Sequence, residues 1–209
     1  MSGCCNHGCE FDRLWRRQRG TLRTVLVINA VMFLVIASAA VYGDSSALFS
    51  DSLDNLGDAL TYALSLFAVS RGASTKAKVA LFKGGLIFIA ASIVVARVGS
   101  KLVEPSVPVY EVMTAFSLLG LAANFVCLSL LWRHREDDVN MSSVWECSRN
   151  DIASNLSVLA ASAGVWLTGT GWPDIAVASC LALLLLRSAA RVIATAVTQL
   201  RAVESDSQV

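Results

Sequence analysis

The acidic side chains between residues 46 and 70 are the first whose type and spacing could do chemistry. Asp51, Asp54 and Asp58, together with Asn55, follow steps of three and four residues in an otherwise apolar segment, so on a helix they form one polar stripe. Asp54 and Asp58 are one turn apart, which lets two carboxylates reach one cation from the same helix. If the segment crosses a membrane, each ionised aspartate costs about 2.5–3.5 kcal/mol near the bilayer centre. The stripe therefore needs a bound cation, protons or water to compensate it.

A second stripe of metal-binding side-chain types falls between residues 143 and 168. Cys147, Asp151 and Asn155 recur every four residues, so they also share one helical face. A thiolate and a carboxylate on this helix, set against the two carboxylates of the first stripe, would complete four ligands. The soft sulfur favours zinc, cadmium or similar ions over magnesium or calcium. We therefore predict a metal site formed by Asp54, Asp58, Cys147 and Asp151.

Other interpretations of these side chains are open at this stage. The aspartates could instead pair with basic groups in apolar segments, such as Lys83 or Arg97. Asp51 lies nearer the outer end of its segment, where water can reach it, so we expect it to be solvated or to line a vestibule. Two further cysteines, Cys127 and Cys180, are typical of small core residues. The candidates for an ion pathway or for contacts that support the ligands are Asp51, Asn55, Asn124 and Asn155.

The composition predicts the elements that must position these stripes. Of 209 residues, 55% are hydrophobic and 16% are charged, whereas an average soluble domain carries about 25% charged residues. Six apolar segments are long enough to cross roughly 30 Å of hydrocarbon as helices. We predict an all-α membrane protein, a bundle of six transmembrane helices, with spans near 22–42, 46–70, 78–99, 109–132, 143–168 and 173–192.

Basic residues lie in alternate connections and predict the orientation. Five arginines from Arg13 to Arg23 precede the first segment, and further basic residues lie within 71–78 and 133–135. The opposite connections carry only Lys101. The positive-inside rule then places both termini in the cytoplasm. The net charge of +1 gives no reason to expect a nucleic-acid partner.

The N-terminal arm, residues 1–20, has a composition suited to capturing a soft cation at the cytoplasmic mouth. It packs Cys4, Cys5, His7 and Cys9 into six residues. The alternative is a disordered tail whose thiols are incidental or lipidated. The arm is polar and arginine-rich and lacks the apolar region of a signal peptide. We expect a transmembrane domain over 21–195 and a short cytoplasmic tail over 196–209.

The residues around both stripes resemble the cation diffusion facilitator family of six-helix divalent-metal transporters. Residues 46–59, SALFSDSLDNLGDA, are similar to the family's Ser-Asp-Ser-x-His/Asp-x-x-x-Asp signature, with Asp54 and Asp58 at the paired ligand positions. Cys147 and Asp151 match its second metal motif, which is usually His-x-x-x-Asp. The resemblance runs from about residue 23 to residue 195, and its further matches are Gly120 and Asn124 in the fourth span and Gly171, Trp172 and Asp174 around the start of the sixth.

The resemblance implies a divalent transition-metal efflux transporter that works by alternating access with proton exchange. The implied cargo is zinc or cadmium, with cobalt, nickel and mercury as further candidates, and no cofactor beyond the transported ion is expected. The implied partners are protons, the lipid bilayer and a second copy of the chain in a homodimer. Cys147 replaces the usual histidine, which suggests a softer ion. We expect this chain to lack the family's cytoplasmic C-terminal domain, so the metal sites and dimer contacts of that domain are not carried over.

Two other functions fit part of the pattern. An intramembrane aspartyl protease also needs two membrane carboxylates, and Leu56–Asp58 reads Leu-Gly-Asp, but its second aspartate should follow a tyrosine and Asp151 follows Asn150. A non-transporting sensor or scaffold could use the N-terminal cysteines and the spans as a metal-responsive surface. We expect a transporter rather than an enzyme. The small size and the lack of an organelle-targeting sequence favour a bacterial inner membrane.

Overall fold

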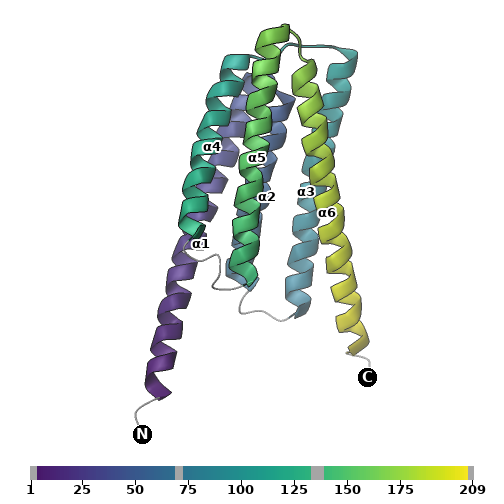
Figure 1. The fold of residues 1–209 in the computed structure, drawn as a ribbon. Coiled ribbons are helices and arrows are strands. Elements are labelled where there is room, and N and C mark those ends of the chain that lie inside the picture. Colours follow the sequence, from purple (N-terminus) through teal and green to yellow (C-terminus); the bar gives the residue numbers. More distant parts are fainter. Residues whose placement is uncertain (1–3, 69–72, 133–138, 207–209) are drawn as a thin grey trace.

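The structure, a computed structural model, describes residues 4–68, 73–132 and 139–206, with side chains from Gly20 onward in the first helix and from Asp151 onward in the fifth. No strand occurs in this part of the chain, so the all-α class is confirmed. Six helices run up and down in one bundle (Figure 1). They are α1 (Cys4–Tyr42), α2 (Ser46–Ala68), α3 (Ala73–Val103), α4 (Tyr110–Trp132), α5 (Val139–Thr168) and α6 (Trp172–Asp206).

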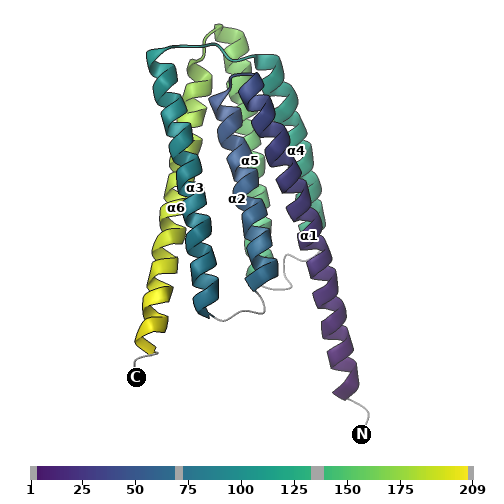
Figure 2. The ribbon, with the colours of Figure 1, turned by 180° about the vertical axis from the view of Figure 1, so that it is seen from behind.

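Helix α2 is the centre of the bundle. The most extensive contacts pair α1 with α2, α4 with α5 and α3 with α6, and α2 touches all five other helices. Figure 2 shows α3 and α6 side by side, next to the group formed by the other four helices. The helix with the acidic stripe is therefore the one most enclosed by protein, as expected for carboxylates that must avoid lipid.

Four of the helices are long and apolar enough to cross a membrane. These segments are Gly20–Tyr42, Ala77–Val103, Tyr110–Trp132 and Trp172–Ala202. Much of their apolar surface faces outward, as at Leu34, Phe82 and Leu183, which are 63%, 67% and 66% exposed. Such a surface is stable in contact with lipid rather than water. Helix α2 falls outside this set because any 18-residue stretch of it contains three aspartates.

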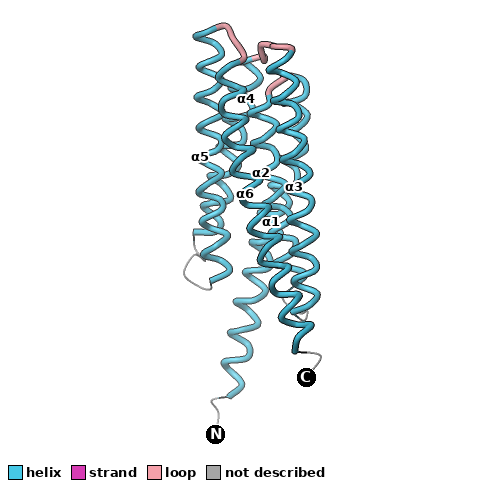
Figure 3. Tube along the Cα trace, turned by 90° about the vertical axis from the view of Figure 1, so that its right-hand side faces the viewer, coloured by secondary structure: helices cyan, strands magenta, loops and turns pink. Residues whose placement is uncertain are grey.

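All six predicted segments are helical, but their ends differ from the prediction. Helix α1 begins at Cys4, so the helix that contains the first span also includes residues 4–20. Helices α3 and α6 extend beyond the predicted 78–99 and 173–192 because polar and basic residues continue them past the apolar stretch. The start of α1 and the end of α6 lie at the same end of the bundle, and α1 continues past the other helices there (Figure 3).

The opposite end holds the three short connections and a compact group of charges. Arg97 Nη2 lies 3.2 Å from Asp44 Oδ1, and Ser106 donates a hydrogen bond of 2.6 Å to Asp44 Oδ2. Lys101, only 6% exposed, lies 3.4 Å from Asp44 Oδ1 and 3.5 Å from Asp174 Oδ2, and it donates to the backbone oxygen of Asp44. We call Asp44, Arg97, Lys101, Ser106 and Asp174 the loop-end cluster. It links the α1–α2 connection to α3, to the α3–α4 connection and to α6.

Asp44 illustrates the electrostatics of the loop-end cluster. Partial burial by itself would raise the pKa of its carboxyl group. The hydrogen bond from Ser106 and the positive charges of Lys101 and Arg97 together outweigh burial, so the pKa of Asp44 lies below its ordinary value of 3.8. The carboxylate is therefore ionised and paired at neutral pH.

Asp174 of α6 caps the first turn of α2. Its fully buried carboxylate accepts hydrogen bonds from Ser45 Oγ at 2.6 Å, from the Ser46 N–H at 2.9 Å and from the Ala47 N–H at 3.0 Å. Ser45 Oγ also accepts from the Leu48 N–H at 3.0 Å, as an N-cap residue does. These bonds satisfy N–H groups that a helix start leaves unpaired, and the negative charge suits the positive end of the helix dipole. The start of α2 is thus fixed to α6.

Candidate metal site

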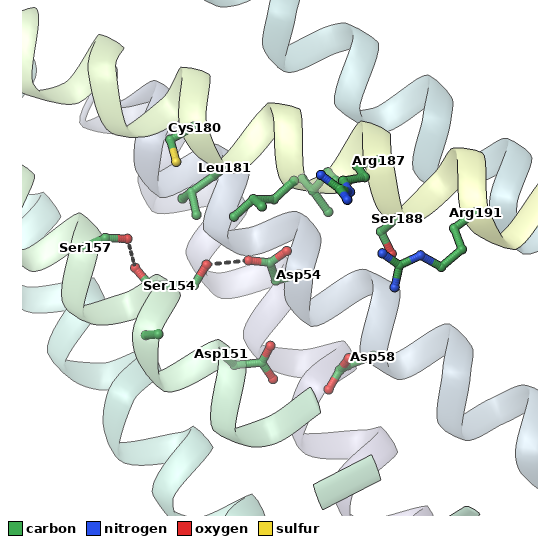
Figure 4. Close-up of a pocket in the computed structure, with 13 residues that line it drawn as sticks. Asp54, Asp58, Asp151, Ser154, Ser157, Cys180, Leu181, Arg187, Ser188 and Arg191 are labelled. Atoms are coloured by element: carbon green, nitrogen blue, oxygen red, sulfur yellow. Dashed lines mark hydrogen bonds between the residues drawn. The ribbon is translucent and has the colours of Figure 1, made fainter. Parts of the chain in front are cut away.

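A cavity of about 700 Å³ lies between α2, α5 and α6. It brings together two of the predicted ligands from α2, Asp54 and Asp58, with one from α5, Asp151 (Figure 4). Hydroxyl groups, apolar side chains and two arginines form the rest of its wall. The lining residues are Asp54, Asp58, Asp151, Ala153, Ser154, Ser157, Cys180, Leu181, Leu184, Leu185, Arg187, Ser188 and Arg191.

Each α2 carboxylate in the cavity accepts a hydrogen bond from a hydroxyl group. Ser154 of α5 donates to Asp54 Oδ2 at 2.7 Å, and Tyr62, one turn further along α2, donates to Asp58 Oδ2 at 2.6 Å. Tyr62 is fully buried and Asp58 is 8% exposed. One oxygen of each carboxylate is therefore oriented by the protein.

Asp151 joins the two polar stripes. Figure 4 shows its carboxyl group opposite that of Asp58 across the α2–α5 interface, and its charge interacts with those of Asp58 and Asp54. Like charges held this close in a low-dielectric site favour a bound cation or protons. Among the described side chains, no group of three or more His, Cys, Asp or Glu residues lies close enough together to hold a metal ion.

Helices α4 and α5 pack closely together beside Asp151, and this contact fixes the face of α5 that carries Asn155. Asn155, 1% exposed, donates from Nδ2 to the Asp151 backbone oxygen at 2.8 Å. A Cβ atom at Gly120 would lie only 2.3 Å from Asn155 Oδ1, so only glycine allows this packing. Asn124, one turn beyond Gly120 on α4, is buried at 2% exposure. Asn155 and Asn124 therefore lie in the packed core behind the cavity rather than in its wall.

The expectation that water reaches Asp51 is wrong. Asp51 has no exposed surface, and both of its carboxylate oxygens lack a hydrogen-bond partner among the side chains and backbone that the structure describes. The reason is that α2 is covered on all sides by other helices, including at its loop-end turns. Asn55 is likewise buried, and it donates to the Asp51 backbone oxygen at 3.3 Å. Neither Asp51 nor Asn55 lines the cavity.

The alternative that basic groups neutralise the aspartates receives limited support. Arg97 pairs with Asp44 rather than with the stripe, and its guanidinium lies 5.2 Å from the Phe49 ring centre. Lys83 donates a hydrogen bond to Thr61 and contributes a favourable positive charge near Asp58. Lys83 can therefore offset part of the negative charge, but the cavity still holds three carboxylates.

Asp54, Asp58 and Asp151 are the predicted site residues in the cavity wall, and the rest of the lining, including Cys180, Arg187 and Arg191, was not predicted. Cys180 is exposed to the cavity rather than packed as a core residue, so that expectation is wrong. Arg187 and Arg191 lie toward the cytoplasmic end of the last predicted span, where basic residues are common. The signal that could have identified them is their spacing with Leu184 and Ser188, which places all four on one face of α6. Cys127 is buried, as expected, and Asn29 Nδ2 lies 3.8 Å from its sulfur.

Some predicted ligands lie outside the described side chains. Cys147 lies one turn before Asp151 in α5, and its side chain belongs to the part of that helix that the structure does not describe. The same holds for the capture residues of α1, which are Cys4, Cys5, His7 and Cys9. These five assignments stay predictions.

The helices define an α-helical, multi-pass integral membrane protein, and its interior contains an acidic cavity. A family model described as the cation efflux transmembrane domain matches residues 22–201. The chain therefore belongs to the cation efflux family, the cation diffusion facilitators, whose members are transporters and not enzymes. No curated protein matches this chain.

Proposed function

We propose that this protein exports a divalent transition-metal ion, zinc or cadmium first among the candidates, in exchange for protons. Asp54, Asp58, Cys147 and Asp151 are the proposed ligands. The single observation that carries the proposal is the meeting of carboxylates from α2 and α5 in one cavity inside a cation efflux domain. An acidic cavity in a membrane domain is costly unless a cation or protons occupy it.

The proposed topology has six spans with both termini in the cytoplasm. Its support is that α1 begins and α6 ends at one end of the bundle (Figure 1), and that the arginine-rich connections belong to that end. Helices α2 and α5 count as spans in this proposal because their neighbours shield their polar faces from lipid. The loop end of the bundle then faces the outside.

The structure fits the inward-facing state of such a carrier. The cavity wall reaches no nearer to the loop end than Asp54 on α2, Ser157 on α5 and Cys180 on α6. Beyond these residues the bundle is packed, and the loop-end cluster ties its connections together. The cavity would thus be closed toward the outside. Export of an ion from it would require the loop-end cluster to rearrange.

The donor set explains both the choice of ion and the coupling to protons. Carboxylates and thiolates bind either a metal ion or a proton at the same atoms, so release of the metal is linked to proton uptake. Cys147 supplies a soft donor, which favours zinc and cadmium and admits mercury, cobalt or nickel. The N-terminal Cys4, Cys5, His7 and Cys9 would raise the local supply of such ions at the cytoplasmic mouth. A homodimer in a bacterial inner membrane is the proposed setting.

The test is metal flux into vesicles that contain the purified protein. With a proton gradient of the exporting sign, wild-type vesicles should accumulate zinc or cadmium, and Asp58→Asn and Asp151→Asn vesicles should not. Cobalt, nickel and mercury tested in the same vesicles define the preference. Glu104→Gln, an exposed carboxylate at the loop end of α3, is the matched control and should transport normally. Normal flux in both cavity variants would overturn the proposal.

A further inference from the structure

Two arginines share the cavity with the carboxylates. Arg187 and Arg191 are one turn apart on α6, and both line the cavity that contains Asp54, Asp58 and Asp151. Figure 4 shows their side chains extending from α6 toward the side of the cavity where Asp54 and Asp58 lie. A positive charge repels a divalent cation, so these residues are unexpected in the wall of a site for metal ions.

The arginines are not paired with the cavity carboxylates in this conformation. Among the side chains that the structure describes, ion pairs within 4.0 Å occur only at Asp44 and Asp174 in the loop-end cluster. The guanidinium groups therefore stand away from Asp54, Asp58 and Asp151 and leave the carboxylates open. An arginine side chain is long and flexible, and its planar fork matches a carboxylate in two parallel hydrogen bonds.

We propose that Arg187 and Arg191 are internal counter-cations that pair with the cavity carboxylates after the metal ion has left. The proposal rests on the proposed export function. Two guanidinium groups carry the same charge as the divalent ion that they replace, so the empty site is neutralised without relying on protons alone. The arginines pair with the carboxylates while the empty carrier returns to the inward-facing state, and they withdraw there, as in the unpaired arrangement of this structure, so that the carboxylates are open to the next ion.

This role predicts that removing the arginines has opposite effects on metal binding and on transport. Because the guanidinium groups compete with the metal ion for the same carboxylates, their removal should tighten metal binding. Because an empty and uncompensated acidic site is costly inside a membrane, their removal should also slow the return of the empty carrier. A purely structural role would instead weaken binding and transport together.

The experiment compares Arg187→Gln/Arg191→Gln with wild type by zinc titration in detergent and by zinc flux in vesicles. We expect zinc affinity on the order of tenfold tighter, the size of effect that a nearby charge has in a partly hydrated site, with a several-fold lower maximal flux. Arg187→Lys/Arg191→Lys should keep the wild-type behaviour because it keeps the charge. Arg201→Gln, an exposed arginine further along α6 and outside the cavity wall, is the matched control.

Unchanged or weaker zinc binding in the glutamine variant, or an unchanged maximal flux, would overturn the proposal. If the double variant does not fold, each single variant is measured in the same two assays. The outcome is separable from that of the export proposal. Asp58→Asn and Asp151→Asn test whether the cavity binds and moves metal at all, whereas the arginine variants test only what occupies it between ions.

Discussion

At the scale of single residues, the cavity carboxylates differ in what orients them. Asp54 is held from α5 by Ser154, and Asp58 is held by Tyr62 from its own helix. Tyr62 is packed among Leu22, Val25 and their neighbours in a buried apolar cluster, so its hydroxyl group has a fixed direction. Groups that orient a metal ligand in this way are commonly as important as the ligand itself.

Tyr62→Phe should therefore weaken zinc binding without unfolding the protein. The phenyl ring keeps the buried packing, and the substitution removes the hydrogen bond of 2.6 Å that orients Asp58 Oδ2. We expect affinity to fall by roughly 10- to 100-fold, measured by calorimetric titration in detergent. Tyr42→Phe, at an 82% exposed tyrosine near the loop end of α1, should bind zinc as wild type does. Equal affinity in the two variants would contradict this role of Tyr62.

Spacing predicted the residue-scale site in part. The steps of three and four residues placed Asp54 and Asp58 on one face, and the cavity contains both. The same spacing does not predict how deeply each position is buried by neighbouring helices. For this reason Asp51 was expected to be solvated, whereas it is buried. Burial depends on how neighbouring helices pack, which a single stripe does not encode.

At the scale of elements, the start of α2 depends on a residue far away in the chain. Asp174 accepts from Ser46 N–H across 128 positions of sequence, and it also pairs with the buried Lys101. Helix α2 carries the proposed ligands five turns or fewer beyond this cap. Because the first turn of α2 is fixed to α6, the positions of Asp54 and Asp58 along the helix axis are fixed relative to the α6 residues that line the cavity.

Asp174→Asn should destabilise the protein strongly. It removes the charge that pairs with Lys101 and weakens the cap of α2, and loss of one partner of a buried ion pair costs about 3–5 kcal/mol. The free energy of unfolding in detergent is the measurement. Lys101 keeps its pairing with Asp44 in this variant, so the loss reports on the cap and the charge of Asp174. Stability equal to wild type in Asp174→Asn would show that the cap contributes little.

At this scale the sequence predicted where the six helices lie along the chain. It did not predict which face each helix turns toward its neighbours. Apolar runs identified all six helices, because roughly twenty apolar residues are needed to cross a bilayer. Which face of α6 meets α2 was not predictable from α6 alone, since its arginines also fitted the cytoplasmic end of the span. The pairing of α3 with α6 settles that rotation and turns Arg187 and Arg191 into the cavity.

At the scale of the whole molecule, the loop-end cluster joins four separate parts of the chain, and its stability should depend on pH. The pKa of Asp44 is lower in the folded protein than its ordinary value of 3.8. A carboxyl group with a lowered folded pKa stabilises the fold fully above the ordinary value, and this contribution is lost as the pH falls through the folded pKa. The cluster should thus weaken only in acid.

The difference in melting temperature between wild type and Asp44→Asn measures this effect. The difference should be constant above about pH 5 and should shrink as the pH falls below 3.8. Other carboxyl groups titrate in both proteins, so comparing the two isolates Asp44. A difference that grows as the pH falls would contradict the pairing of Asp44 with Lys101 and Arg97.

The central claim is that α2 and α5 bind one metal ion jointly, and zinc titration of the purified protein tests it most directly. The titration uses Cys4→Ser/Cys5→Ser/Cys9→Ser protein, so that the N-terminal cysteines add no second site. We predict one zinc ion per chain, with affinity reduced by about 100-fold or more both in Asp54→Asn/Asp58→Asn and in Asp151→Asn, since each removes ligands of the same tetrahedral site. Wild-type affinity in either variant, or two ions per chain of which each variant loses one, would contradict a shared site.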